Sequence, residues 1–320
     1  MEFKKTFRDI WTILKATFRG FSDNKVTKLG GSLAYSAVFS MGPMLIVVIS
    51  LCGLFLGRDA VEGRVYATLT GFLGQESAAS IQAIIKQAAI RGHSMLAVVV
   101  GAVVLLVGAT SVFSEIQDSI NDIWGVKPKP KRGWLKMLQN RFLSFSVIVG
   151  LGFLLLVSMF FTTVLDAFSD QLHTHFPGIA IVVIYIINQV LTLVVTTVIF
   201  AVIFRVLPDA DIQWRDVIAG AIVTALLFML GKFAISVYIS KTKVATSYGV
   251  AGSLVVVLLW IYYSSLILYL GAEFTKAYAI QYGSEIHPNE YAVTTRQVEV
   301  ETGNKSIQEN VKADVREDKK

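Results

Sequence analysis

Lys232 is the residue whose type and position point most directly to chemistry. It stands inside an apolar run, residues 217–240, and Ser236 follows one helical turn later on the same face. A charge inside a membrane-spanning run is costly and marks a functional position by default. A buried ammonium would need an acidic partner or an anionic ligand. The alternative is a lysine that extends its stem to the nearer end of the run, and the sequence leaves both open.

Small and polar side chains recur in two other apolar runs. Ser32, Ser36 and Ser40 follow one another at intervals of four, and Pro43 frees a backbone carbonyl one turn earlier. In the last run, Tyr262 and Glu273 fall on one helical face. A kinked helix that lines a polar path explains this pattern, and so does close helix packing through small residues. The candidate path consists of Tyr35, Ser36, Ser40, Pro43, Lys232, Ser236, Tyr262 and Glu273.

Three carboxylates form a candidate acidic cluster after the second apolar run. Glu115, Asp118 and Asp122 share one face of a predicted helix. Three carboxylates can hold a divalent cation, but such a face more often pairs with neighbouring basic residues, here within 127–141. We therefore expect no metal site. The chain also lacks a Gly-x-Ser-x-Gly elbow, a phosphate-binding glycine loop and zinc-ligand spacing, so we expect no cofactor and no enzymatic activity.

The elements that must position these residues are membrane-spanning helices. Apolar residues make up 54% of the 320-residue chain and charged residues 16%, against about 25% charged in typical soluble domains. Mean hydropathy is +0.61. Runs of about 20 residues suffice to cross a bilayer, and backbone groups without water partners must then be helical. We predict an all-α polytopic protein with six spans: 33–57, 95–114, 142–165, 179–204, 217–240 and 250–272.

Basic residues are segregated into particular loops rather than spread over a nucleic-acid face. They gather in segments 1–32 and 115–141, while loop 166–178 holds none. The positive-inside rule then predicts that both termini are cytoplasmic. Amphipathic surface helices are expected at 3–21 and 77–91, the first on an anionic leaflet. Residues 1–282 form the expected membrane domain, and residues 283–320, which lack an apolar period, form a disordered charged tail.

Three stretches of the chain resemble the YihY/BrkB-like family of bacterial inner-membrane proteins. The resemblance covers nearly the whole chain except the tail and implies a six-span protein of the cytoplasmic membrane. It also implies a role in lipid or amphiphile transport or in the envelope. Its motifs are Leu33-Ala34-Tyr35 with Phe39-Ser40 and Pro43, Ala109-Thr110 through Asn121-Asp122-Ile123-Trp124, and Tyr248-Gly249 through Trp260, Tyr262-Tyr263-Ser264-Ser265 and Gly271-Ala272-Glu273-Phe274.

A ribonuclease label attached to some members of that family does not fit this chain. Nucleases of that type need a His-x-His-x-Asp-His cluster, and here Phe176 and Pro177 follow His173-Thr174-His175 in place of the last two ligands. We expect a transporter or translocase of lipids or other anionic amphiphiles, whose partners are membrane lipids with anionic headgroups and not nucleic acid. The alternative is a non-transporting scaffold that organises envelope proteins; the sequence identifies no protein partner.

Overall fold

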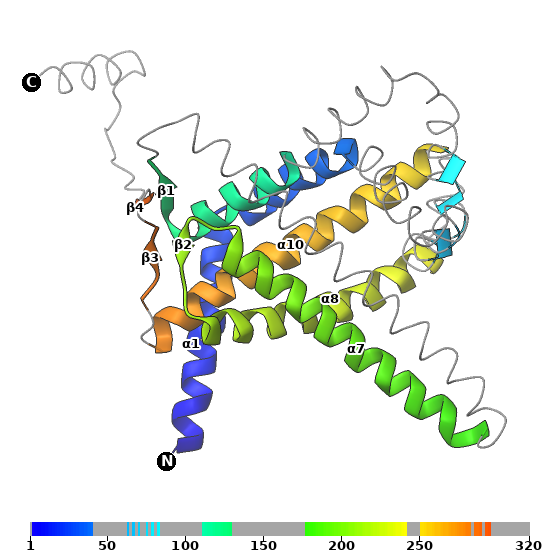
Figure 1. Cartoon of the computed structure of the whole chain (residues 1–320), viewed down its shortest axis with the longest axis horizontal. Coiled ribbons are helices and arrows are strands. Elements are labelled where there is room, and N and C mark those ends of the chain that lie inside the picture. Colours follow the sequence, from blue (N-terminus) through cyan, green and yellow to red (C-terminus); the bar gives the residue numbers. More distant parts are fainter. Residues whose placement is uncertain are drawn as a thin grey trace, which may run out of the picture.

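The structure is a computed structural model that describes residues 2–40, 111–129, 177–241, 250–282, 285–289 and 292–295, with scattered positions between 63 and 83. This part of the chain is mostly helical (Figure 1). The expected spans 33–57, 95–114 and 142–165, and the expected surface helix 77–91, lie wholly or largely outside the described residues.

Three described helices are long and apolar enough to cross a membrane. They are α7 (Pro177–Val206), α8 (Trp214–Lys241) and α10 (Val250–Tyr282), with spanning segments Ile186–Val206, Trp214–Ile235 and Leu254–Tyr282. They coincide with the fourth, fifth and sixth expected spans. The expected and observed helices differ most at the C-terminal end of α10. This helix continues beyond residue 272 to Tyr282 because its last turns pack against the N-terminal helix.

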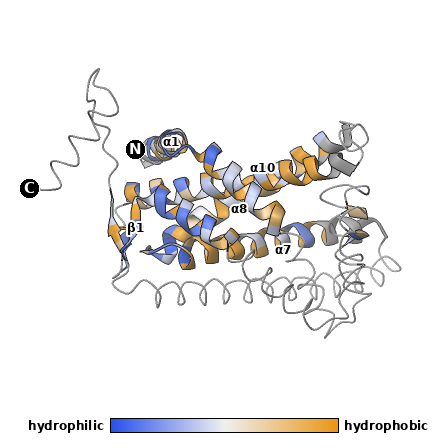
Figure 2. Cartoon of the chain, turned by 90° about the horizontal axis from the view of Figure 1, so that it is seen from above, coloured by the Kyte–Doolittle hydropathy of each residue, from blue (hydrophilic) through white to orange (hydrophobic). Residues whose placement is uncertain are grey.

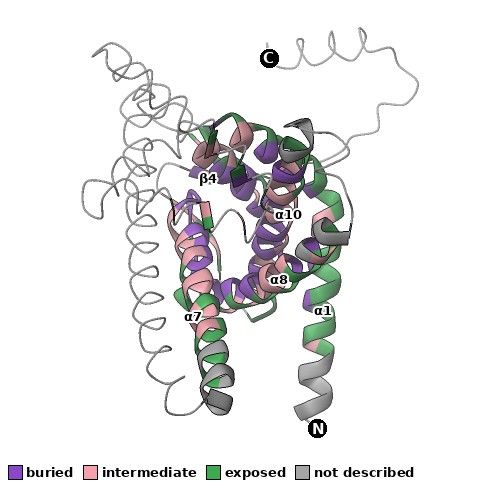
Figure 3. Ribbon diagram, turned by 90° about the vertical axis from the view of Figure 1, so that its right-hand side faces the viewer, coloured by how far each residue is buried: buried purple, intermediate pink, exposed green. Residues whose placement is uncertain are grey.

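Apolar side chains on the outer faces of α7 and α8 are exposed. A soluble protein would bury such stripes, whereas a bilayer solvates them. Figure 3 shows exposed residues along α1 and the outer part of α7, and buried residues within α8 and α10. The stripes consist of Val183, Ile186, Ile187, Val190, Val194 and Val198 on α7, and Ile218, Ile222, Leu226, Leu230 and Phe233 on α8.

Reciprocal glycine–threonine contacts join α8 and α10. A β-carbon at Gly220 would overlap Thr275 Oγ1, and one at Gly271 would overlap Thr224 Oγ1. Each threonine donates to the glycine carbonyl one turn earlier in its own helix, at 2.6 Å from Thr224 and 2.7 Å from Thr275. Small residues let membrane helices approach closely. The crossed pairs, 220 with 275 and 224 with 271, show that the two helices run antiparallel with each glycine against a threonine side chain. Gly231 continues the seam, because a side chain there would overlap the Tyr263 hydroxyl.

A ladder of aromatic rings joins α7, α8 and α10. Phe204 stacks on Phe200 with ring centroids 6.1 Å apart. Phe228 meets Phe200 edge-on at 5.9 Å and Trp260 edge-on at 6.0 Å. Edge-to-face pairs of this kind favour one relative orientation of the rings, and therefore of the three helices that carry them.

The N-terminal helix α1 (Glu2–Asp23) crosses α10 near its C-terminal end (Figure 1). It meets α10 through Ile13, Thr17 and Gly20, while Trp11 and Phe18 on its next face are 63% and 62% exposed. A break at Asn24-Lys25, where Lys25 has φ 51°, separates α1 from a second helix, residues 26–40. That helix runs along α10, with Gly30 against Leu266 and Tyr262.

Helix 111–124 ends at Gly125, whose φ of 69° is left-handed. Glycine favours this conformation because it has no β-carbon. The chain then enters β1 (Val126–Pro128), which pairs antiparallel with β4 (Ala292–Thr294). A second two-stranded ribbon joins β2 (Ala210–Asp211) to β3 (His287–Pro288).

The two ribbons place part of the expected C-terminal tail against the helical domain. Residues 285–289 and 292–295 carry β3 and β4, and Asn289 also donates its amide to the Asp209 carbonyl at 3.0 Å. These residues therefore belong with the membrane domain rather than with a disordered extension. The strands are only two and three residues long, too short to show an alternating pattern in the sequence. Residues 296–320 lie outside the described residues.

Candidate functional site

Buried polar residues gather at the polar end of the bundle, which we define as the end where residues 207–213 join α7 to α8 and where α10 terminates. Figure 2 shows hydrophilic residues concentrated at this end, beside α1 and β1. Asp209 is 2% exposed and accepts hydrogen bonds from Asn121 Nδ2 at 2.9 Å and Gln117 Nε2 at 3.2 Å. The Asp209 amide in turn donates to Asn121 Oδ1 at 2.8 Å. Helix 111–124 is thereby fixed to the α7–α8 connection.

The same helix is held to α10 by two further bonds. Trp124 Nε1 donates to the Ala272 carbonyl at 3.2 Å, and Lys276 Nζ donates to the Ile123 carbonyl at 2.6 Å. The lysine therefore caps one of the carbonyls that the C-terminus of a helix leaves without an intrahelical partner.

Glu273 is the buried carboxylate of α10. Its side chain is 3% exposed, and Asn24 Nδ2 donates to its Oε1 at 2.6 Å. A β-carbon at Gly20 would overlap its other oxygen, so only glycine lets α1 approach this closely. The carboxylate is thus enclosed where α10 packs against the break that follows α1.

The acidic cluster of helix 111–124 lies beside Asp209. Asp118 is an exposed residue, yet the atoms around its carboxyl and the negative charges of Glu115, Asp122 and Asp209 raise its pKa. Both desolvation and nearby like charges disfavour the ionised carboxylate. Among the described residues, no three carboxylate, histidine or cysteine side chains are placed to hold a metal ion.

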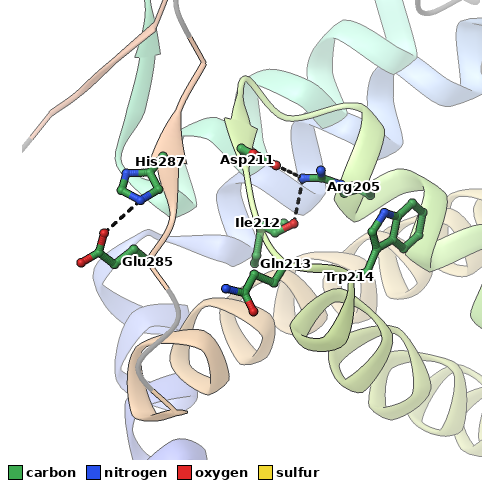
Figure 4. A pocket seen from close by; sticks show the side chains of 7 residues that line it. All are labelled: Arg205, Asp211, Ile212, Gln213, Trp214, Glu285 and His287. Carbon is green, nitrogen blue, oxygen red and sulfur yellow. Dashed lines mark hydrogen bonds and ion pairs between the residues drawn. The ribbon is translucent and has the colours of Figure 1, made fainter.

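A pocket of about 590 Å³ opens at the polar end (Figure 4). Arg205, at the end of α7, contacts the Asp211 carboxylate, donates to the Ile212 carbonyl at 2.7 Å and lies over the Trp214 ring at 5.9 Å. On the facing strand, His287 Nε2 lies 2.9 Å from Glu285 Oε2. The pocket is lined by Arg205, Asp211, Ile212, Gln213, Trp214, Glu285 and His287.

The residues of the predicted path lie in three places. Ser36 is half-buried and Ser40 is buried, and Ser40 donates to the Ser36 carbonyl at 2.8 Å, while Tyr35 is 67% exposed and stacks on Phe39. Tyr262 and Glu273 both face the N-terminal helices, through Gly30 and Gly20 respectively. Pro43 and the Ser236 side chain lie outside the described residues.

Lys232 is half-buried on α8, away from the polar end. At 1.5 Å per residue it lies about 27 Å along the helix from Trp214, and a hydrocarbon core is about 30 Å thick. Since the spanning segment of α8 begins at Trp214 and ends at Ile235, Lys232 lies in its last turn. Glu273, by contrast, lies about 13 Å from the end of α10 at Tyr282.

Sequence reasoning missed the Asp209 hub, the carboxylate of Asp216 and the glycine–threonine seam. Asp216 is 1% exposed, and its Oδ2 has no hydrogen-bond partner among the described residues. The seam had a detectable signal, because α8 and α10 each carry Gly-Ala-x-x-Thr, at 220–224 and 271–275. The hub had none, since its donors and acceptor lie 88 and 92 residues apart.

Long apolar helices with exposed apolar faces, joined through small residues, define a multi-pass helical membrane protein. The comparisons with known proteins agree. Residues 17–293 match the family described as virulence factor BrkB, and the chain belongs to that family.

Its relatives include proteins named "UPF0761 membrane protein" in three bacteria. The one from Pseudoalteromonas atlantica is 25% identical over 82% of this chain and 85% of its own length. The one from Mannheimia succiniciproducens is 24% identical over 84% of this chain and 91% of its own. The one from a Janthinobacterium species is 26% identical over 86% of this chain but 62% of its own. No solved structure shows a significant match.

Proposed function

We propose that this protein translocates lipids or other anionic amphiphiles across the bacterial cytoplasmic membrane, without a catalytic step of its own. The observation that carries the proposal is Glu273, a carboxylate buried within the spanning segment of α10. A charged residue inside a spanning helix is costly, and such residues commonly line substrate or ion paths. Glu273 also accepts a hydrogen bond from Asn24 at the break between α1 and helix 26–40, where Lys25 has a left-handed conformation.

The proposed orientation places the polar end and both termini in the cytoplasm. The basic residues of 1–32 and 127–141 favour it. In this orientation the exposed apolar face of α1 meets the inner leaflet, and Arg8, Lys15 and Arg19 lie beside that face at headgroup level. Anionic lipid headgroups are therefore the proposed partners of α1.

A second candidate function is a non-transporting scaffold of the envelope. The glycine–threonine seam favours it, because side chains of α10 press against Gly220 and Gly231, and Thr224 of α8 presses against Gly271. The α8–α10 interface is closed at these positions. A scaffold needs such rigid packing, whereas a translocase needs at least one interface that opens.

Reconstitution separates the two functions. Purified protein in liposomes with fluorescent phosphatidylglycerol should expose inner-leaflet lipid to an external quencher, with or without a proton gradient. The Glu273→Gln variant should lose most of this activity. The control is Asp23→Asn, which makes a similar change in an exposed residue that pairs with Arg19 at 3.6 Å. Wild-type liposomes that behave like protein-free liposomes under both conditions would reject translocation.

The scaffold makes the opposite prediction for growth. Glu273→Gln and Lys232→Ala cells should grow normally, whereas removal of residues 296–320 should abolish function. The truncation must begin after Thr295, since a cut at 283 would also remove β3 and β4 and so disturb the fold. Growth defects in the two point variants, with a tolerated truncation, would reject the scaffold.

A further inference from the structure

The pocket at the polar end lies at the level of the lipid headgroups. The spanning segment of α7 ends at Val206, that of α8 begins at Trp214 and that of α10 ends at Tyr282. The pocket is built from the residues at those ends and immediately beyond them. Trp214 is 52% exposed, and tryptophan is enriched at membrane–water interfaces. A lipid that approaches these helix ends from the bilayer meets the pocket with its headgroup.

Opposite charges face each other across the pocket. The β2–β3 register sets Asp211 directly opposite His287, and on each side of the pocket an acidic side chain lies beside a basic one (Figure 4). Arg205 pairs with the Asp211 carboxylate, and His287 lies next to the Glu285 carboxylate. The side chains of Asp211, Glu285 and His287 are 66%, 79% and 67% exposed and accessible to a ligand. Two carboxylates would repel a purely anionic ligand, whereas a zwitterion finds a partner for each of its charges.

Arg205 is held in place and retains donors for a ligand. A guanidinium has five N–H donors, and its contacts with Asp211 and Ile212 both run through Nη1. Nε and Nη2 therefore leave three donors in the fixed fork that suits a phosphate. The Trp214 ring beneath the guanidinium keeps its plane in position.

We propose that this pocket binds the headgroup of a phospholipid that carries a primary ammonium beside its phosphate diester. Arg205 contacts the phosphate, and Glu285 and Asp211 accept hydrogen bonds from the ammonium. The volume of about 590 Å³ lies within the roughly 300–1,000 Å³ of small-molecule sites. This site goes beyond the proposed translocation, because a bound headgroup does not require that the lipid crosses the membrane.

Native mass spectrometry of the detergent-solubilised full chain tests the proposal by counting bound lipids. Phosphatidylethanolamine is titrated against phosphatidylglycerol, which lacks the ammonium, and phosphatidylcholine, whose quaternary ammonium cannot donate. We expect about tenfold tighter binding of phosphatidylethanolamine, as charged hydrogen bonds to the ammonium imply. Equal binding of the three lipids would overturn the proposal. Soluble glycerophosphoethanolamine should bind at least about tenfold more weakly than the lipid, since it lacks the acyl chains; equal affinity would overturn the assignment to a lipid.

Matched variants locate the binding. Arg205→Met should weaken phosphatidylethanolamine binding about tenfold, whereas Arg215→Met, an exposed arginine outside the pocket, should leave it unchanged. Equal losses in both variants would show nonspecific charge attraction and overturn the proposal. Glu285→Gln should remove the preference for phosphatidylethanolamine over phosphatidylglycerol while the latter still binds; an unchanged preference would also overturn it.

Two readouts keep the test independent of folding and of transport. Arg205 supports the α7–α8 connection, so its variant is checked by gel filtration, and the exposed Glu285 variant decides the outcome if Arg205→Met does not fold. Wild-type protein that binds phosphatidylethanolamine selectively but does not flip lipids supports this site and rejects translocation. Protein that flips lipids without any such selectivity rejects this site alone.

Discussion

Asn121→Ala should destabilise the protein more than any single surface change on the same helix. The substitution removes the 2.9 Å bond from Asn121 Nδ2 to the buried carboxylate of Asp209 and the 2.8 Å bond that the Asp209 amide donates to Asn121 Oδ1. Only the longer, 3.2 Å bond from Gln117 still reaches the carboxylate from helix 111–124.

The magnitude follows from these two bonds. A hydrogen bond to a charged group contributes about 1.5–3 kcal/mol and a neutral one about 0.5–1.5 kcal/mol. Their sum gives an expected loss of about 2–4.5 kcal/mol in the free energy of unfolding. Asp122→Ala, one residue along and exposed, should change it by less than about 0.5 kcal/mol.

The assay is unfolding by titrated dodecyl sulfate in mild detergent micelles, followed by circular dichroism. Asp209→Ala and the double variant complete a thermodynamic cycle. Once Asp209 is absent, Asn121→Ala should cost much less than in the wild type, so the two changes should be far from additive. Additive effects, or an Asn121→Ala protein as stable as the Asp122→Ala control, would refute the assignment of Asp209 as the centre of this hub.

Three further outcomes are expected. Gly220→Ala should lower the free energy of unfolding by about 1–3 kcal/mol, because the new β-carbon overlaps Thr275. Gly31→Ala has open space around it and should raise that free energy by up to about 1 kcal/mol through helix propensity. Equal effects of the two substitutions would contradict close packing at the seam. Desolvation and neighbouring carboxylates raise the folded-state pKa of Asp118 above its unfolded value. The contribution of Asp118 to the free energy of unfolding is therefore fully present below the unfolded pKa. It is lost as the pH rises through the folded pKa. Asp118→Asn should therefore stabilise the protein at pH 7, and this gain in stability should vanish in acid. Unfolding titrations at several pH values measure it. A gain in stability that does not depend on pH would argue against this cause. Trp11→Phe should remove part of the tryptophan fluorescence that brominated lipids quench, since Trp11 lies on the exposed apolar face of α1; undiminished quenching would place that face in water.

Spans that are apolar throughout were predictable, and their ends were less so. α7 and α8 extend only a few residues beyond the expected 179–204 and 217–240, because length and hydropathy suffice where lipid is the neighbour. α10 runs on to Tyr282 because α1 packs against its last turns and Lys276 caps the C-terminus of helix 111–124. Those stabilising contacts are tertiary, and hydropathy contains no signal for them.

The polar contacts of the site were not predictable from one sequence. Asn24 and Glu273 are 249 positions apart, and their pairing depends on the crossing of α1 over α10. The Arg205 pocket similarly needs β3 to return beside β2, in a segment whose polar composition resembles a tail. Residue type did indicate Glu273. Its partner required the register of the folded chain.

The placement of the buried charges indicates which interface would have to open if lipid moves through the protein. The α8–α10 seam is closed where a threonine side chain of each helix packs against a glycine of the other, and separating the helices would expose both threonine–glycine pairs at once. The contact of α1 with α10 instead includes a side-chain hydrogen bond, from Asn24 to Glu273, at a break where helical hydrogen bonding is already interrupted. Movement of the N-terminal helices away from Glu273 needs that bond to break and leaves the α7–α8–α10 bundle intact. We therefore expect a polar path to run beside Tyr262 and Glu273 on α10, with Lys232 at its far membrane surface rather than at its centre.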